Sequence, residues 1–178
     1  MEPFAERVFE NYPDLDYEID RTTGNLPSNI RVIEFYFPAG KFINNPLAQQ
    51  NYVSSNYTHV ARDLIDKGVN VIAQMITLSP DHKRASLSCN AGVTTDILSS
   101  VSRDSILFIG KVNNNLPFMH GDADLPVSSF DHIIQNTALD CKLFGPPKLS
   151  ISDVDYMIGL HASTLVRDDG ELQIGIGA

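Results

Sequence analysis

The sequence predicts an α/β fold: a three-layer α/β/α sandwich with a mostly parallel, mixed sheet. From Ile30 onward, β-branched apolar segments alternate with segments of helical character, which is the order produced when helices connect parallel strands. Some apolar segments are separated only by short polar turns, so a few antiparallel strands are also expected. We predict one partial α/β domain over residues 30–178, preceded by a helical and irregular leader over residues 1–29.

The first half of the predicted domain contains two strands and two helices. Residues 30–37 (IRVIEFYF) are β-branched and aromatic and predict a strand, whereas residues 45–53 suit a short helix or turn. Thr58 is placed to cap a helix that ends at Gly68. Residues 69–78 are almost entirely apolar, which is typical of a parallel strand covered on both faces.

The second half continues the alternation. Residues 85–89 predict a hairpin partner, and Thr94 or Thr95 begins a helix. Residues 105–113 predict a buried strand, and residues 126–134 a return strand.

The C-terminal part is predicted to hold one more helix and one more strand. Ser150 or Ser152 caps a helix through Val166, and residues 170–178 read as a turn, a strand and the start of a glycine loop. Natural domains seldom end on an apolar strand, so we expect this chain to be part of a larger protein.

Composition and charge narrow the functional classes. The chain has 22 acidic and 13 basic residues, a net charge of -9, and no basic cluster, so nucleic acid is not an expected partner. No apolar run is long enough to cross a bilayer, and the N-terminal residues lack the pattern of a signal peptide. We therefore expect a cytoplasmic protein without a membrane partner, in which Cys89 and Cys141 are reduced and buried.

Three polar loops follow predicted strands, where open α/β sheets bind ligands. The loop after residue 78 contains His82, which we interpret as a solvated turn residue. The loop over residues 113–124 gathers amides, an imidazole and carboxylates, but one histidine with two aspartates is a weak metal pattern, so no metal is predicted. The third loop holds Gln173, Gly175 and Gly177, where an amide donor and loop N–H groups suit a thioester or carboxylate oxygen. The alternative for Gln173, which residue type alone favours, is an edge-strand glutamine that faces water.

Five segments of the chain resemble motifs of a known protein family and occur in the same order as in that family. They are Thr58-His59-Val60, VNVIAQMITLSPDH, Gly92 to Asp96, GKVNNNLPFMHGDADLPVSSFDHII and DDGELQIGIGA. Together they resemble the acetyl-CoA hydrolase/transferase group of class I coenzyme A (CoA) transferases, which includes 4-hydroxybutyrate, butyrate and succinate–acetate CoA-transferases.

The resemblance implies an enzyme that moves CoA between an acyl-CoA and a carboxylic acid, or water, through a glutamyl-CoA intermediate. It places the nucleophilic glutamate beyond Ala178, so the chain alone is predicted to be inactive. It implies no cofactor other than the CoA thioester substrate, and a homo-oligomer as the assembly. The substrate-binding residues it implies are Gln173, Gly175, Gly177, Asn113, His120 and Gly121.

Two alternatives come from the residues themselves. An α/β interaction module without catalytic activity would use its C-terminal strand for docking. A nucleotide-binding domain would use the glycine loop, although this loop lacks the third glycine and the later acidic residue of a dinucleotide-binding fingerprint.

Overall fold

The computed structural model describes residues 15–37, 40, 42–143, 150–173 and 175 of the chain. The described residues fall into two compact units, one within Tyr12–Leu143 and the other within Phe144–Ala178. The first unit contains the sheet, and each unit is described separately below.

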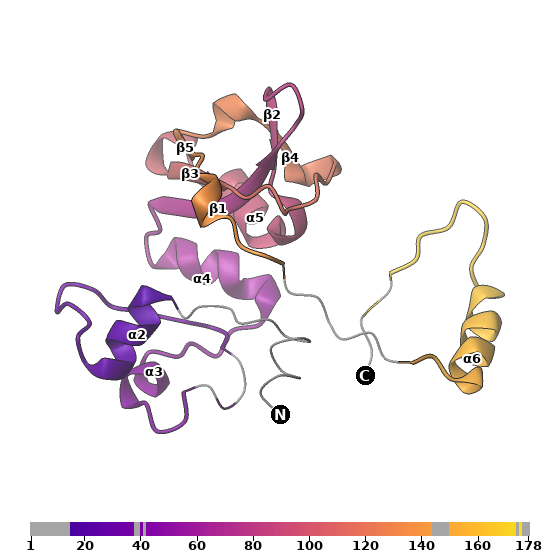
Figure 1. Cartoon of the computed structure of the whole chain (residues 1–178), viewed down its shortest axis with the longest axis horizontal. Coiled ribbons are helices and arrows are strands. Elements are labelled where there is room, and N and C mark those ends of the chain that lie inside the picture. The colour runs from indigo at the N-terminus through magenta and orange to yellow at the C-terminus, as the bar shows by residue number, and fades with distance from the viewer. Residues whose placement is uncertain (1–14, 38–39, 41, 144–149, 174, 176–178) are drawn as a thin grey trace. The chain divides into compact units, whose positions relative to one another are not determined.

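The sheet of the first unit has five strands in the order β4-β2-β1-β3-β5 (Figure 1). Strands β1 (Val71–Leu78), β3 (Leu107–Val112) and β5 (His132–Ile134) run parallel to one another. Strand β2 (Arg84–Ser86) pairs antiparallel with β1, and strand β4 (Asp124–Pro126) pairs antiparallel with β2. The predicted fold class is therefore confirmed as α/β with a mixed sheet and flanking helices.

The parallel register brings three strand ends to one edge of the sheet. Val71 pairs with Leu107 and Ile76 with Val112, and Ile109 pairs with His132 on the far side of β3. The polypeptide therefore leaves β1, β3 and β5 at the same carboxyl edge, where side chains from three loops can meet.

The core lies on one face of this sheet. Ile76 and Phe108 are fully buried, and the Phe108 and Phe130 rings stack with centroids 4.2 Å apart. Burying side chains of this size contributes about 1.5–3 kcal/mol each. A Cβ atom added to Gly110 would lie 2.5 Å from Ile76 Cδ1 and 3.0 Å from Phe130 Cδ1. A residue without a side chain is thus required in the middle of β3.

Two short helices pack together beside the sheet, α4 (Val60–Asp66) and α5 (Gly92–Ser100). The chain leaves α4 through Gly68 in the left-handed conformation, as predicted. The predicted Thr58 cap is wrong, because Thr58 lies inside a 3₁₀ turn and His59 occupies the cap position. Ala91 precedes α5, which begins two residues before Thr94.

The predicted strand over residues 69–78 forms, but within the first unit one of its faces is covered much less than the other. Ile72 and Ile76 are buried, whereas the alternate residues Val71 and Met75 are 48% and 38% exposed. The apolar run therefore predicts more burial of this strand than the described residues provide.

The predicted strand over residues 30–37 is absent. Among these residues only Glu34 forms a β-bridge, to Tyr52. Tyr52 comes directly after the end of helix α3 (Pro46–Gln50) at Asn51, so the paired segment is too short to form a strand ladder. The described part of the predicted leader over residues 1–29 contains helix α2 (Asp16–Thr23). The short helix predicted at residues 45–53 is confirmed as α3, with the Asn45 side chain as its cap.

The predicted return strand over residues 126–134 is also divided. Its first residue, Pro126, ends β4 and pairs with Arg84 of β2 at one edge of the sheet, whereas its last three residues form β5 and pair with β3 at the other. A single straight strand cannot reach both neighbours, so a 3₁₀ turn at Val127–Ser129 carries the chain across.

The second unit contains helix α6 (Asp153–Ser163). Ser152 is its cap: the Ser152 hydroxyl accepts from the Asp155 N–H, and the Asp155 carboxylate accepts from the Ser152 N–H, as a capping box requires. The strand predicted after residue 170 is absent from the described part, since residues 171–173 and 175 pair with no strand there. Across the described ranges, no helix has the length and apolar character needed to span a membrane.

Candidate functional site

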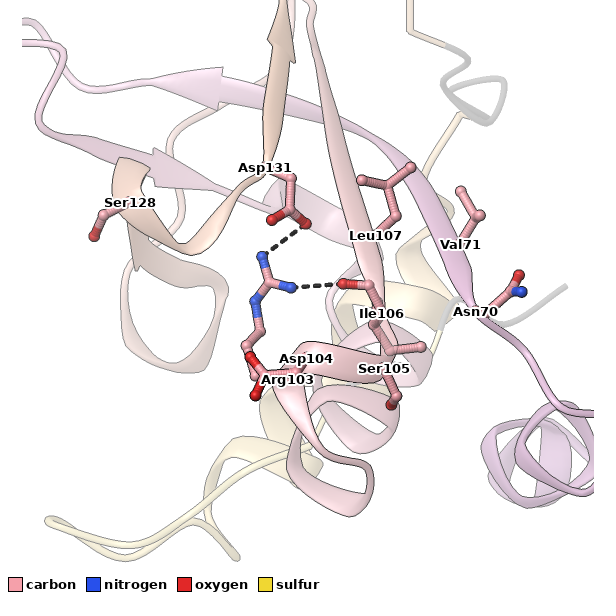
Figure 2. A pocket seen from close by; sticks show the side chains of 9 residues that line it. All are labelled: Asn70, Val71, Arg103, Asp104, Ser105, Ile106, Leu107, Ser128 and Asp131. Atoms are coloured by element: carbon pink, nitrogen blue, oxygen red, sulfur yellow. Dashed lines mark hydrogen bonds and ion pairs between the residues drawn. The ribbon is translucent and has the colours of Figure 1, made fainter.

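One hollow of the described residues lies at the amino ends of β1 and β3 (Figure 2). It has a volume of about 760 Å³, and Arg103 and Asp131 are its central charged pair. Arg103 donates to Asp131 Oδ2 at 2.8 Å and to the carbonyl oxygens of Ile106 and Ser129 at 2.6 and 2.9 Å. Its charge and most of its donors are therefore used to hold β3 to the segment before β5.

The opposite, carboxyl edge is the better candidate, because open α/β sheets bind ligands there. Asn113 directly follows β3 and is fully buried. Its Nδ2 donates to the Cys141 carbonyl oxygen at 3.0 Å, and its Oδ1 accepts from the Asn115 N–H at 3.1 Å. Asn113 thus joins the loop after β3 to the segment after β5, and its polar atoms face protein groups.

A charged pair lies beside Asn113 on the same edge. Lys111 Nζ is 3.1 Å from Asp140 Oδ1, and the Asn114 side chain donates to Asp140 Oδ2 at 2.7 Å. The hydrogen bond from Asn114, followed by that from Lys111, lowers the pKa of the Asp140 carboxyl below its usual value. Asp140 therefore stays ionised and holds the two loops together.

Two serines of β2 and its extension fix the next part of the polar loop. Ser86 Oγ accepts from the Met119 and Ser88 N–H groups, at 3.0 and 3.1 Å, and donates to the Met119 carbonyl oxygen at 2.7 Å. Ser88 Oγ donates to the Pro117 carbonyl oxygen at 2.9 Å. Both serines are buried, so this loop is held by interior hydrogen bonds.

The His120 side chain extends from this anchored loop into solvent. Its side chain is 84% exposed, with Nδ1 3.6 Å from Asp124 Oδ2, while Asp124 Oδ1 pairs with Arg84 Nε at 2.6 Å. Gly121 follows in the left-handed conformation, at φ 78°, which favours glycine. The loop therefore presents an accessible imidazole beside a carboxylate that an arginine holds in place.

The remaining predicted residues lie elsewhere. His82 is exposed in a left-handed turn between β1 and β2, consistent with a solvated residue. The two cysteines are free thiols, as expected, but both are exposed, so the prediction that they are buried is wrong. Neither lies in a strand: Cys89 lies in the 3₁₀ turn that follows β2, and Cys141 lies in the segment after β5. Within the described ranges, no group of three His, Cys, Asp or Glu side chains could hold a metal.

Gln173 and Gly175 belong to the second unit, and both are exposed. Gly177 lies outside the described residues. The structure therefore brings Asn113, His120 and Gly121 onto one loop, whereas a shared pocket with Gln173 stays a prediction.

Ser86, Ser88 and Asp140 are the residues of this edge that the sequence analysis did not identify. Ser86 and Ser88 alternate with apolar residues, a pattern that usually indicates serines on the solvent face of a strand. Asp140 resembles any loop aspartate. Only the fold shows that the serines bond to the backbone of Pro117–Met119 and that Asp140 accepts a hydrogen bond from Lys111.

Comparison with known proteins gives a consistent result, although no protein-family model matches the chain. A segment of 90 residues, 51% of the chain, is 37% identical to the 4-hydroxybutyrate coenzyme A transferase of Clostridium kluyveri. A segment of 124 residues, 68% of the chain, is 30% identical to the succinyl-CoA:cyclohexane-1-carboxylate CoA transferase of Geobacter metallireducens. The chain is similar to the CoA-transferases. The resemblance predicted from the sequence is thus confirmed.

This CoA-transferase-like chain matches only part of each relative. The two matched segments span 20% and 27% of the lengths of those curated proteins. Among solved structures, RipA from Yersinia pestis matches with a TM-score of 0.59 at 24% identity, over 92% of this chain and 37% of RipA, which supports the fold. A structure of a RipA point mutant matches with a TM-score of 0.53 at 27% identity, over 72% of this chain and 28% of that one.

Proposed function

We propose that this chain is a segment of an acyl-CoA transferase that moves CoA between an acyl-CoA and a carboxylic acid. The observation that carries the proposal is the 37% identity to a 4-hydroxybutyrate coenzyme A transferase over 90 residues. The fold supports it, because the candidate site lies at the carboxyl edge of a mixed α/β sheet.

The proposed reaction uses a glutamate supplied from outside these 178 residues. Its carboxylate attacks the thioester carbonyl and expels the CoA thiolate, which leaves a mixed anhydride on the glutamate. The thiolate then attacks the glutamyl carbonyl, releases the first acid and forms a glutamyl-CoA thioester. A second carboxylate takes the CoA by the reverse of these steps. The isolated chain is accordingly proposed to be inactive.

The loop after β3 is proposed to form one wall of the acyl-CoA pocket. His120 offers an exposed ring from a backbone that Ser86 and Ser88 hold in place, and Gly121 allows a close approach of the main chain. Asn113 contributes by positioning this wall rather than by touching substrate, since its polar atoms bond to protein groups. Gln173, Gly175 and Gly177 are proposed to supply donors to the thioester or carboxylate oxygen.

The test uses the full-length protein that contains this chain, incubated with acetyl-CoA and labelled butyrate. The expected result is labelled butyryl-CoA and, without an acceptor acid, a covalent CoA adduct on a glutamate beyond Ala178, located by peptide mass spectrometry. His120→Ala should lower kcat/KM, while His82→Ala serves as the matched control because His82 lies in a solvated turn.

Each other outcome of this assay contradicts a defined part of the proposal. Release of free CoA without butyryl-CoA would identify water as the acceptor and a hydrolase in place of a transferase. Absence of both an adduct and exchange would remove the assignment to CoA chemistry and favour an interaction module.

A further inference from the structure

Arg21 of helix α2 is buried although it is an arginine. Its side chain is 2% exposed, and its Nη1 donates to Glu34 Oε2 at 2.6 Å. The Nε and Nη2 atoms are also buried, and neither has a hydrogen-bond partner in the described part of the chain. Buried guanidinium donors are rarely left unpaired, because each loses its hydrogen bonds to water without replacement.

The contacts around Arg21 account for the guanidinium face but not for these donors. The guanidinium carbon lies 4.2 Å from the centroid of the Phe42 ring, a cation–π contact made through the flat face. The N–H groups point outward in the plane of the guanidinium, so ring stacking cannot satisfy them. A planar acceptor with two oxygens matches such a fork better than any single atom does.

A cavity of about 280 Å³ lies against this arginine. The charged residues of its wall are Arg21 and Arg31, and the wall contains no carboxylate, in a chain whose net charge is -9. The rest of the wall is mainly apolar; it comprises Leu26, Ile30, Val32 and Leu47, with Ser28 and Asn51. The cavity thus combines local positive charge with an aliphatic lining.

We propose that this cavity binds a small carboxylate anion with a short aliphatic tail. The carboxylate oxygens accept from the unpaired donors of Arg21 and from Arg31, whose Nε already bonds to Asn51 Oδ1 at 2.8 Å. The tail contacts the leucine, isoleucine and valine side chains. A phosphate fits less well, because the oxygens that do not bond to the arginines would face this apolar lining. The volume is just below the range usual for ligand pockets, which limits the ligand to a few carbon atoms.

The test is an NMR titration of the 178-residue chain with sodium butyrate, with sodium phosphate and sodium chloride at equal ionic strength as parallel titrations. We expect saturable shifts of the amides of Arg31, Val32 and Asn51 with butyrate only. Arg31→Gln, at an exposed position, should weaken butyrate binding about tenfold, the usual effect of losing one hydrogen bond to a charged group.

Two further variants complete the design. Arg62→Gln removes another exposed arginine, one that pairs with Asp63 outside the cavity, and should leave the affinity unchanged. Arg21→Lys keeps the charge toward Glu34 but loses the fork, and should also weaken binding if the chain remains folded. Saturation by phosphate but not butyrate, equal losses in the Arg31 and Arg62 variants, or no saturable shift with any anion would each overturn the proposal. This site does not depend on the proposed CoA transfer, since butyrate binding is measured without any CoA.

Discussion

The Asn113 side chain donates to the Cys141 carbonyl oxygen at 3.0 Å, and this bond joins the loops that follow two neighbouring parallel strands. The same amide nitrogen lies 3.2 Å from Cys141 Sγ, which is itself 3.5 Å from Met75 Sδ. Residues that leave β3 and β5, and one from β1, therefore meet at one place on the carboxyl edge. The shape of the candidate site depends on this junction.

The first prediction concerns that junction. Asn113→Ala should lower the free energy of unfolding by about 1–3 kcal/mol, because the Cys141 carbonyl and the Asn115 N–H both lose a buried partner. Urea denaturation at neutral pH measures the change. Asn25→Ala is the matched control, since Asn25 is exposed and its side chain bonds to Thr23. Equal effects of the two substitutions would show that Asn113 does not organise the edge.

The second prediction concerns the anchoring of the His120 loop. Ser86→Ala removes the Oγ atom that bonds to both the N–H and the carbonyl of Met119, so the loop should open more often. We expect a loss of about 1–3 kcal/mol in the free energy of unfolding and faster amide exchange at Met119.

Ser99→Ala is the control for that experiment. Ser99 lies on the exposed side of α5 and bonds to the Asp96 carbonyl of the preceding turn. Its loss should change the free energy of unfolding by no more than about 0.5 kcal/mol. Unchanged exchange at Met119 in the Ser86 variant would mean that other contacts hold the loop.

The third prediction is a pH dependence. The hydrogen bond from the Phe108 N–H, followed by that from Arg103, lowers the pKa of the Asp131 carboxyl below its ordinary value of 3.8. A carboxyl whose folded pKa lies below its unfolded pKa stabilises the fold above the unfolded value and loses this contribution as pH falls through the folded pKa. We therefore expect stability to decrease below about pH 4.

Carbon-13 NMR of the labelled aspartate carboxyl groups measures this pKa directly. Asp131→Asn removes the titrating group, so the loss of stability as the pH falls below about 4 should be smaller in that variant than in the parent chain. An Asp131 pKa at or above 3.8 would contradict the expectation and indicate that the hydrogen bonds from the Phe108 N–H and from Arg103 are weak.

How much the sequence predicts depends on the range of the interactions involved. Residues 69–78 and 105–113 form β1 and β3 because long apolar runs define buried parallel strands with little help from context. Ser152 caps α6 because capping is local. The apparent strand at residues 30–37 fails for the opposite reason: strand formation requires a partner, and only Tyr52 is available to it.

The candidate site shows the same division. The sequence placed Asn113, His120 and Gly121 on a loop after a strand, and the structure agrees. It could not show that Asn113 is buried and points at Cys141, since that depends on where the chain returns 28 residues later. The buried Arg21 was missed because an arginine in a polar segment normally indicates a solvated face.

The last prediction tests the packing that supports the candidate edge. In Gly110→Ala, the new Cβ would lie 2.5 Å from Ile76 Cδ1 and 3.0 Å from Phe130 Cδ1, so these side chains must move. Overpacking of this kind costs about 1–3 kcal/mol of unfolding free energy, to be measured by urea denaturation. Gly159→Ala, in the open part of α6, is the control and should be neutral or stabilising by about 1 kcal/mol, because alanine favours a helix.

A compensating substitution makes the test specific. Ile76→Val removes the Cδ1 atom that meets the new methyl group, at a cost of about 0.5–1.5 kcal/mol when made alone. In the Ile76→Val, Gly110→Ala double variant, the valine leaves room for the alanine methyl, so the total loss should be smaller than the sum of the two single losses. Additive losses would show that Gly110 is required for a reason other than the close approach of Ile76, such as the contact with Phe130.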